Sequence, residues 1–302
     1  MFRGIIIYYG LHGFNAICGI HGPYLRLRRG TNGSLLHSVG FVGSLGFMDI
    51  VAVLNMKGGV GKTTTAANLS HALARMGRRV LAVDLDAQAN LTSWLGAEEA
   101  PRAVLAHALK DAKVVHLAIG PSRATGVDLL YGSSATSVTE QELVGDKNPS
   151  TVLRRVLRPL VEYDYIVLDC PPGLGLITIN AIAAAHEIIV PIETQTMALS
   201  GVGLLMQNIE DLLDAEVLTV APKIRAVATK HDSRNGLARA VLIHLRSSNG
   251  IPAMETTIRT NVRLAECYGL KKTIFDHAPD ASGAADYEEL AREFVAAETV
   301  VA

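Results

Sequence analysis

The sequence predicts a doubly wound α/β fold, with a mainly parallel sheet that carries helices on both faces. Short apolar runs rich in β-branched residues alternate along the chain with segments whose apolar residues recur at helical spacing. This alternation is typical of βαβ crossovers, which join neighbouring parallel strands. The 302 residues, of which 49% are hydrophobic and 19% charged, suffice for one large folded domain with a full core.

From residue 48 onward the expected elements can be followed in chain order. The expected strands are apolar runs at residues 50–54, 80–85, 126–131, 165–169, 187–192, 224–229 and 254–258. The expected helices cover residues 66–76, 151–161, 177–185, 198–213, 237–247 and 285–297. Gly77 follows the first helix as its C-terminal stop, since glycine readily adopts the left-handed conformation that ends helices.

Residues 1–47 differ in composition from the rest of the chain. They contain four arginines and no acidic residue, are rich in glycine and show no sustained periodicity. We expect Met48 to be the natural start of one domain over residues 48–302, and residues 1–47 to be a mis-assigned or disordered extension. A basic arm that touches DNA or membrane is the alternative.

Composition narrows the classes of function. No uninterrupted apolar run approaches the roughly 20 residues of a transmembrane helix. The three cysteines lack the spacing of a metal site or a disulfide framework, which is typical of a cytoplasmic protein. The net charge of −1 gives no bulk attraction to nucleic acid, but residues 222–272 hold ten basic and three acidic residues. This excess predicts a basic surface suited to weak, salt-sensitive phosphate binding, with solvated helix faces as the alternative.

Residues 57–64 read K-G-G-V-G-K-T-T and carry the clearest chemical signal in the chain. The ordinary phosphate-binding loop, G-x-x-x-x-G-K-[ST], requires glycine at position 56, where this chain has Met56 followed by Lys57. The variant form K-G-G-x-G-K-[ST] fits at every position. An apolar strand precedes the loop and a helical pattern follows it, which is the context that such a loop requires. A glycine-rich turn that binds nothing is the alternative.

The residue types of this loop suit a nucleoside triphosphate with Mg²⁺. Glycines let backbone N–H groups converge on phosphate oxygens, and a helix N-terminus adds partial positive charge. Lys62 is expected to neutralise the β- and γ-phosphates, and the Thr63 hydroxyl to coordinate Mg²⁺. The expected nucleotide-binding residues are Lys57, Gly58, Gly59, Val60, Gly61, Lys62, Thr63 and Thr64.

Carboxylates follow two of the expected strands. Asp84 and Asp86 come at the end of the second strand, and because successive strand side chains alternate between faces, both are expected on one face. Asp169 ends the apolar strand at residues 165–169, an arrangement in which a carboxylate holds Mg²⁺, often through water. A polar loop cap is the alternative for Asp84 and Asp86.

The loop resembles the deviant Walker A motif of the ParA/MinD family of ATPases, and similar segments extend over roughly residues 48–296. D-L-D-A-Q-A-N at residues 84–90 resembles the family's D-x-D-x-Q-x-N segment, and D-C-P-P at residues 169–172 its switch loop. The resemblance implies that Lys57 reaches the nucleotide of a partner subunit and that Asp86 orients the attacking water. The implied catalytic residues are Lys57, Lys62, Asp86 and Asp169, with Thr63, Asp86 and Asp169 at the metal.

Two further segments resemble parts of the family that contact DNA in its chromosomal branch. They are T-K-H-D-S-R-N-G-L at residues 229–237 and N-V-R-L-A-E at residues 261–266. Thr260 stands where the family has an arginine, so we expect the DNA surface to shift toward neighbouring basic residues. The implied DNA-binding residues are Arg234, Arg259, Arg263 and Lys272.

The resemblance as a whole implies a ParA-type partition or positioning ATPase with ATP and Mg²⁺ as ligands. ATP is expected to hold two copies together as a homodimer that binds DNA without sequence specificity on the nucleoid. Hydrolysis is expected to release the dimer, in the service of chromosome or plasmid segregation. Turnover is expected to be slow and to be raised by a ParB-like activator protein.

Two alternatives remain open. A MinD-like ATPase cycles on membrane through a basic amphipathic C-terminal helix. The residues after Arg292 include two acidic and no basic ones, so we expect no stable membrane association. The other alternative is a catalytically weak interaction module that positions a protein cargo. Dimerisation without ATP-dependent DNA binding would favour it.

Overall fold

The computed structural model describes residues 28–29, 35–36, 48–195, 200–247 and 251–299. Two compact units divide the chain, one made of Met48–Phe294 and the other of Met1–Phe47 with Val295–Ala302. The sheet and the site that are described below belong to the unit Met48–Phe294.

The N-terminal residues contribute one described pair of short strands. β1 (Arg28–Arg29) pairs antiparallel with β2 (Leu35–Leu36). Most of residues 1–47 lie outside the described residues. The expectation that they are an extension before a natural start at Met48 therefore stays a prediction.

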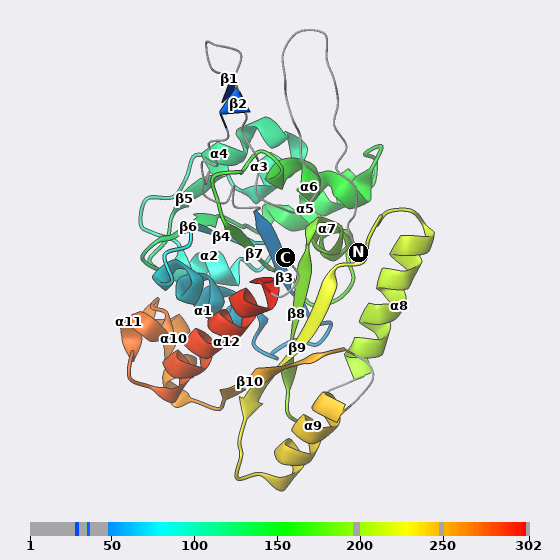
Figure 1. Cartoon of the computed structure of the whole chain (residues 1–302). Coiled ribbons are helices and arrows are strands. Elements are labelled where there is room, and N and C mark those ends of the chain that lie inside the picture. Colours follow the sequence, from blue (N-terminus) through cyan, green and yellow to red (C-terminus); the bar gives the residue numbers. More distant parts are fainter. Residues whose placement is uncertain (1–27, 30–34, 37–47, 196–199, 248–250, 300–302) are drawn as a thin grey trace. The chain divides into compact units, whose positions relative to one another are not determined.

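The unit Met48–Phe294 is built on an eight-stranded sheet with the order β10-β9-β8-β3-β7-β4-β6-β5 (Figure 1). All neighbouring strands are parallel except β5, which runs antiparallel to β6. The strands are β3 (Asp49–Val53), β4 (Val80–Asp84), β5 (Ile119–Pro121), β6 (Val127–Leu130), β7 (Tyr165–Asp169), β8 (Glu187–Glu193), β9 (Lys223–His231) and β10 (Ala253–Arg259). The predicted parallel α/β sheet is confirmed, and each of the seven expected strands begins and ends within two residues of its prediction.

Within this sheet, the strand that the sequence did not predict lies at the edge. β5 has three residues, Ile-Gly-Pro, and pairs only with β6 among the described strands. Three residues are too few to show an alternating pattern, and proline is tolerated at an edge because it has no N–H to donate to a further strand. The sequence therefore carried no strand signal at this position.

Helices α1 to α9 lie between the strands in chain order, as the alternation of patterns predicted, and α10 to α12 follow β10. They are α1 (Lys62–Arg75), α2 (Asn90–Leu95), α3 (Leu105–Lys110), α4 (Val115–Ala118), α5 (Ala135–Leu143), α6 (Val152–Leu157), α7 (Leu176–Ala184), α8 (Ser200–Asp214), α9 (Gly236–Ser247), α10 (Val262–Leu270), α11 (Ile274–His277) and α12 (Ser282–Thr299). None of the described helices combines the length and the hydrophobicity that spanning a membrane requires.

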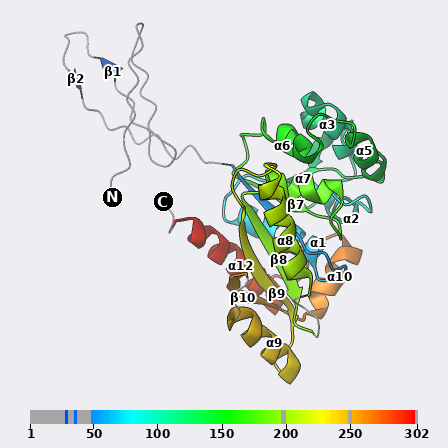
Figure 2. The same ribbon diagram turned by 90° about the vertical axis from the view of Figure 1, so that its right-hand side faces the viewer.

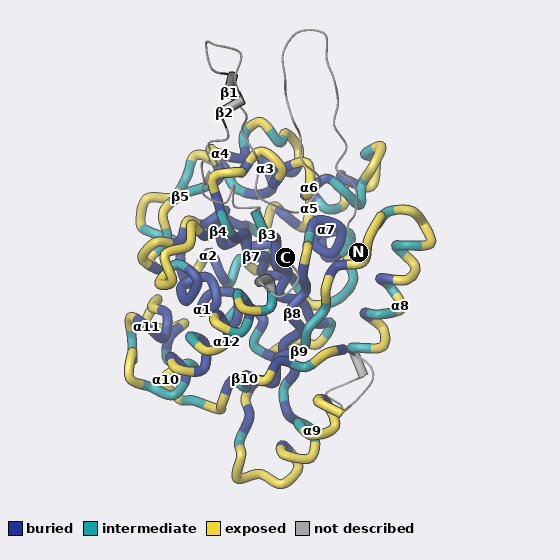
Figure 3. The backbone as a smooth tube through the Cα atoms, in the orientation of Figure 1, coloured by how far each residue is buried: buried dark blue, intermediate teal, exposed yellow. Residues whose placement is uncertain are grey.

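Helices cover both faces of the sheet because alternate residues of its buried strands point to opposite sides. In β3, Ile50 and Ala52 pack into a core with residues of α6 and α7. Val51 and Val53 are equally buried and point to the other face, where α1 packs. Figures 1 and 2 place α1 and α8 on opposite sides of the sheet, and Figure 3 shows the buried residues concentrated in the central strands and in α1.

Two helix ends show how local chemistry sets the boundaries. Gly77 has a φ of 79°, and the N–H groups of Gly77 and Arg78 donate to carbonyls of the last turn of α1, which confirms the predicted stop. The helix expected over residues 151–161 was predicted too long, since α6 ends at Leu157. Pro159 has no N–H to donate to the carbonyl of Arg155, so the helical hydrogen-bond ladder ends there.

The order of the strands fixes where a ligand can bind. From β3 the chain moves outward through β4 to β6, returns to β7 beside β3, and then builds β8, β9 and β10 on the other side. The direction of winding therefore reverses around β3. In open parallel sheets, ligands bind beyond the carboxyl ends of the strands at this point of reversal.

Candidate nucleotide-binding site

The glycine-rich loop lies between the end of β3 and the start of α1, at the point of reversal. Gly59 and Gly61 have φ angles of 77° and 95°, in the left-handed region that other residues rarely adopt. A Cβ atom added at either glycine, or at Gly58, would meet no atom within 4 Å. The loop therefore borders open space, which leaves its backbone accessible to an anion.

The first turn of α1 adds favourable electrostatics to this space. Its N-terminal N–H groups donate to no side-chain cap, and no acidic residue stands in the first turn. Free N–H groups and the helix dipole attract negative charge to such an N-terminus. The loop and the start of α1 together make a site that suits phosphate.

Lys62 brings a positive charge into this site. Its side chain is buried, and its ammonium donates to the carbonyl of Lys57 at 3.1 Å. Burial lowers the pKa of Lys62, and the nearby carboxylates, Asp169 foremost, oppose that shift. Among the described residues no carboxylate lies within ion-pair distance of this ammonium, so an anionic ligand can become its partner.

Two buried aspartates stand side by side at the carboxyl ends of neighbouring strands. Asp84 and Asp169 end β4 and β7, stand opposite each other in the register and are fully buried. Burial raises the pKa of Asp84 to about 6 and holds the pKa of Asp169 well above its usual range, with the charge of Asp84 adding to the second shift. The Thr63 hydroxyl opposes this shift, because it lowers the pKa of Asp169.

The two aspartates differ in their hydrogen bonds. Asp84 accepts the backbone N–H groups of Thr92 at 2.7 Å and of Asp86 at 3.2 Å, so it anchors the segment after β4. Both carboxyl oxygens of Asp169 are buried without a hydrogen-bond partner in the described part of the chain. A buried carboxyl group without a partner is costly, which indicates that Asp169 is kept for a ligand.

The donor set fits Mg²⁺ shared with a phosphate ligand. The unpartnered oxygens of Asp169 and the nearby Thr63 hydroxyl are hard oxygen ligands of the kind that Mg²⁺ prefers. Within the described residues no group of three or more His, Cys, Asp or Glu side chains could hold a metal alone. Mg²⁺ commonly binds through one or two protein oxygens together with phosphates and water, so this arrangement is the expected one.

Asp86 lies just beyond β4 in a tight turn. Its carboxylate accepts the N–H of Gln88 at 2.9 Å, and its carbonyl accepts the N–H of Ala89, whose φ is 52°. The side chain is half-buried, and its charge acts on both Lys62 and Asp169. Asp86 is therefore near the phosphate site yet open to solvent, as a residue that positions water must be.

Lys57 differs from Lys62 in that its side chain faces outward. Its side chain is 50% exposed, and its ammonium lies 3.9 Å from the Glu193 carboxylate. Its backbone N–H donates to Asn55 at 2.9 Å, and Asn55 in turn donates to the carbonyl of Pro191 at 2.7 Å. Asn55 thus ties the backbone of the loop to β8, whereas the Lys57 side chain contacts only Glu193 among the described residues.

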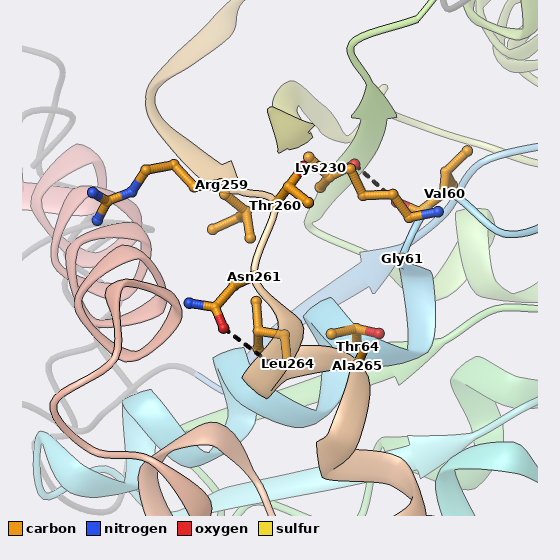
Figure 4. A pocket seen from close by; sticks show the side chains of 11 residues that line it. Val60, Gly61, Thr64, Lys230, Arg259, Thr260, Asn261, Leu264 and Ala265 are labelled. Atoms are coloured by element: carbon orange, nitrogen blue, oxygen red, sulfur yellow. Dashed lines mark hydrogen bonds between the residues drawn. The ribbon is translucent and has the colours of Figure 1, made fainter. Parts of the chain in front are cut away.

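A pocket of about 210 Å³ opens beside the loop, between the carboxyl ends of β9 and β10 and the start of α1 (Figure 4). Gly61 and Thr64 form its side toward the loop, and Lys230, Thr260 and Asn261 line it from the strand ends. The lining combines apolar side chains with a few polar ones, as in sites for small organic ligands. The pocket is contiguous with the phosphate site through Gly61.

Comparison with known proteins decides the family. A family model described as an AAA domain matches residues 48–220. The chromosome-partitioning ATPase Soj of Thermus thermophilus is 41% identical over 249 residues, which cover 82% of this chain and 95% of that protein. The chromosome partitioning protein ParA of Myxococcus xanthus is 35% identical over 272 residues, which cover 89% and 95%. The chain belongs to the ParA/MinD family of ATPases.

A solved structure agrees with this membership. Cobyrinic acid a,c-diamide synthase from Mycobacterium smegmatis, with bound ADP and magnesium, has a TM-score of 0.69 and 31% identity to this chain. The match covers 82% of this chain and 93% of that one. The ParA/MinD fold of the present chain is therefore supported by sequence and by structure alike.

The four basic residues that this ParA/MinD member was expected to present to DNA lie in different surroundings. Arg234 is 90% exposed and pairs with Asp232 at 3.0 Å, and Arg263 pairs with Glu266 at 3.0 Å. Lys272 is exposed, and its carbonyl accepts the indole N–H of Trp94.

Arg259 has the most extensive contacts of the four. Its guanidinium binds both oxygens of Asp286 on α12, a carboxylate that is 8% exposed, and it points away from Lys230 toward that helix (Figure 4). The backbone N–H of Arg259 donates to the same carboxylate at 2.9 Å. These contacts fix β10 to α12, so Arg259 has a packing role beside the DNA role expected of it.

The sequence missed three residues of the site. Asn55, Glu193 and Lys230 each come at or just after the carboxyl end of a buried strand. A polar residue at that position of a parallel sheet is a usable signal, because all such ends meet on one side. What the sequence could not provide is the neighbour order of β3, β8 and β9 that brings the three together.

Proposed function

We propose that this protein is a ParA-type partition ATPase that dimerises on ATP, binds DNA without sequence specificity and is released by hydrolysis. The observation that carries the proposal is the open glycine loop with two lysines of different character. Lys62 is buried at the phosphate site, whereas Lys57 is half exposed and directed outward. One lysine can serve the nucleotide of its own subunit, and the other can reach a second copy.

Within one subunit, we assign ATP and Mg²⁺ to the site around the loop. Backbone N–H groups of residues 58–64 and the Lys62 ammonium bind the phosphates, while Thr63 and Asp169 hold Mg²⁺. The bound metal would neutralise the negative charge that develops on the phosphate oxygens. Asp86 orients the attacking water from the solvent side. The Mycobacterium smegmatis relative with ADP and magnesium supports both ligands.

The pocket beside the loop is the place that we assign to the nucleoside. It adjoins Gly61 and Thr64 at the start of α1, so a nucleotide whose phosphates occupy the loop extends into it. Lys230, Thr260 and Asn261 are polar residues that line this side of the site (Figure 4). Hydrogen bonds from such polar residues to the base and ribose determine how tightly the pocket binds the nucleoside.

Assembly and release follow from the charge of the ligand. Two bound triphosphates that face each other repel, and a lysine from each subunit on the other's phosphates offsets that repulsion. Hydrolysis removes the γ-phosphate and with it one partner of Lys57, so the dimer weakens. We propose that turnover is slow in the isolated protein and is raised by a ParB-like partner, as the family resemblance implies.

DNA binding is proposed for the basic surface on α9, α10 and the neighbouring loops, and hence a location on the nucleoid. Arg234, Arg263 and Lys272 are exposed there. Arg234 and Arg263 are held by exposed carboxylates, and pairs of this kind are weak enough to exchange for phosphate. The cargo is a chromosome or a plasmid.

The experiment that tests the proposed function measures binding of non-specific duplex DNA with ATP, with ADP and without nucleotide, across a salt series. Binding with ATP alone, with a steep loss of affinity as salt rises, is the expected result. Binding that ignores the nucleotide would exclude a nucleotide-gated switch. Dimerisation on ATP without any DNA binding would favour a protein or membrane cargo.

A further inference from the structure

Glu193 lies between two lysines at the edge of the phosphate loop. One of its carboxylate oxygens is 3.9 Å from the ammonium of Lys57, and the other is 3.5 Å from the ammonium of Lys230. The Glu193 side chain is only 13% exposed, whereas the two lysine side chains are about half exposed. A carboxylate that is largely withdrawn from water requires a cationic partner, and this one has two within reach.

Lys230 is also fixed to the loop itself. Its ammonium donates to the carbonyl of Gly59 at 2.7 Å, and the hydroxyl of Thr229 donates to the carbonyl of Val60 at 2.9 Å. The backbone of Lys230 has a φ of 49°, in a region that residues other than glycine rarely adopt. The end of β9 is therefore held against the loop by two consecutive side chains, and Lys230 stays near Glu193 when Lys57 moves.

We propose that Glu193 holds the Lys57 side chain on the subunit to which Lys57 belongs. Lys230 permits the release of Lys57, because Lys230 remains paired with the Glu193 carboxylate. The inference rests on the proposed cross-subunit role of Lys57. When Lys57 crosses to a second copy, Glu193 loses one cation. Without Lys230, a mostly buried carboxylate would be left unpaired at the subunit interface, which opposes dimerisation. Glu193 and Lys230 are positioning residues in this account, since neither contacts the reacting atoms.

The proposal predicts effects of opposite sign for the two residues. Glu193→Gln frees Lys57 and should lower the dimer dissociation constant about two- to fivefold, the range for partly exposed ion pairs. Lys230→Gln leaves Lys57 as the only cation near Glu193 among the described residues and should raise that dissociation constant by a similar factor. In the double variant no carboxylate can be left unpaired, so Lys230→Gln should have little effect when Glu193→Gln is already present.

The experiment is sedimentation velocity over a concentration series, with a non-hydrolysable ATP analogue and Mg²⁺, on the wild-type chain and the three variants. ADP affinity, measured on each protein without dimerisation, corrects for any change in nucleotide binding through the Gly59 contact. Glu142→Gln is the matched control, since Glu142 pairs with Lys110 at 2.5 Å on exposed helices away from the loop. That control should leave the dimer constant unchanged.

Opposite shifts that disappear in the double variant support the proposal. Weaker dimerisation by Glu193→Gln, or an undiminished effect of Lys230→Gln in the double variant, overturns it while leaving the proposed function intact. If Lys230→Gln fails to fold, the sign of the Glu193→Gln effect decides alone. A wild-type chain that stays monomeric with the analogue overturns the proposed cross-subunit role and this inference with it.

Discussion

The centre of the sheet and its β9–β10 side differ in whether their charged side chains have ion-pair partners. At the ends of β3 and β7, Lys62 and Asp169 are buried, and neither has an ion-pair partner in the described part of the chain. Beyond β9 and β10, Arg234, Arg259 and Arg263 are each paired with a carboxylate. The charged groups of the first region need a ligand as their partner, whereas the arginines of the second region already have partners within the protein.

The difference identifies which region was shaped by a ligand. Burial of an unpaired charge costs several kcal/mol, so a fold retains it only when a bound group repays that cost. Exposed ion pairs contribute about 0–1 kcal/mol and exchange readily. Substitutions in the central region should therefore have large effects. In the outer region, the effect of each substitution should depend on how far the ion pair that it removes is buried.

The largest effect is expected at Lys62. Lys62→Ala removes the charge that faces the phosphates and should lower ATP hydrolysis by at least about 100-fold, the usual cost of one preorganised electrostatic contact. Phosphate release under saturating ATP measures it. Lys110→Ala, which removes an exposed lysine paired with Glu142, is the control and should hydrolyse ATP like the wild type. A rate within threefold of wild type in Lys62→Ala would contradict the account of the central region.

Asp86→Ala should separate binding from chemistry. The carboxylate is half-buried at the solvent side, so its loss should slow hydrolysis about 100-fold while ATP affinity changes by less than about threefold. The variant should accumulate as an ATP-bound, DNA-bound dimer. Rapid-quench hydrolysis and equilibrium ATP binding check the two halves, and wild-type hydrolysis would remove Asp86 from the mechanism.

The buried aspartates predict a pH dependence of stability in the absence of ligand. Burial raises the folded-state pKa of Asp169, and that of Asp84 to about 6, above their unfolded values near 4. The folded state therefore holds more protons, and stability is lost as the pH rises from about 4 through the folded-state pKa values.

Urea unfolding with EDTA and without nucleotide measures this dependence. Wild-type stability should fall by about 1–3 kcal/mol between pH 4.5 and 7.5, and Asp169→Asn should lose much of that slope because its amide does not ionise. Added Mg²⁺ and ATP should restore wild-type stability at pH 7.5. Identical slopes in the two proteins would show that Asp169 is not the buried unpaired group described above.

A smaller effect distinguishes the arginines of the outer region. Arg259→Ala leaves the buried Asp286 without its partner and should lower the free energy of unfolding by about 1–3 kcal/mol. Arg234→Ala removes an exposed pair and should change stability by less than about 0.5 kcal/mol while weakening ATP-dependent DNA binding. Thermal unfolding and DNA titration check both. Equal destabilisation by the two variants would contradict the distinction by burial.

The sequence predicted the central region well because its signals are local. Residues 57–64 are contiguous, and Asp169 directly ends a fully apolar strand, so both could be read without knowing the fold. The parallel sheet was predictable for the same reason, from short buried strands separated by helical patterns. The end of α6 was predicted too far along the chain, although Pro159 already marks it, and the sequence analysis gave no helix for α2, α3, α4, α5, α10 or α11.

Two pairings were harder to predict because their partners are distant in the chain. Arg259 meets Asp286 across 27 residues, and Lys57 meets Glu193 across 136. Neither pairing leaves a mark in local composition or periodicity. A basic count over residues 222–272 therefore predicted a charged surface correctly but could not tell a free arginine from one that holds two elements together.

The most direct test of the central claim compares ATP-driven dimerisation of the wild-type chain and Lys57→Ala by sedimentation velocity. Lys57, together with Met56 in place of glycine, separates this loop from an ordinary phosphate-binding loop, and the Lys57 side chain faces outward. We predict that the wild type dimerises with a non-hydrolysable ATP analogue and that Lys57→Ala stays monomeric while still binding ADP. Equal dimerisation of the two proteins would contradict the cross-subunit role of Lys57 and the nucleotide switch built on it.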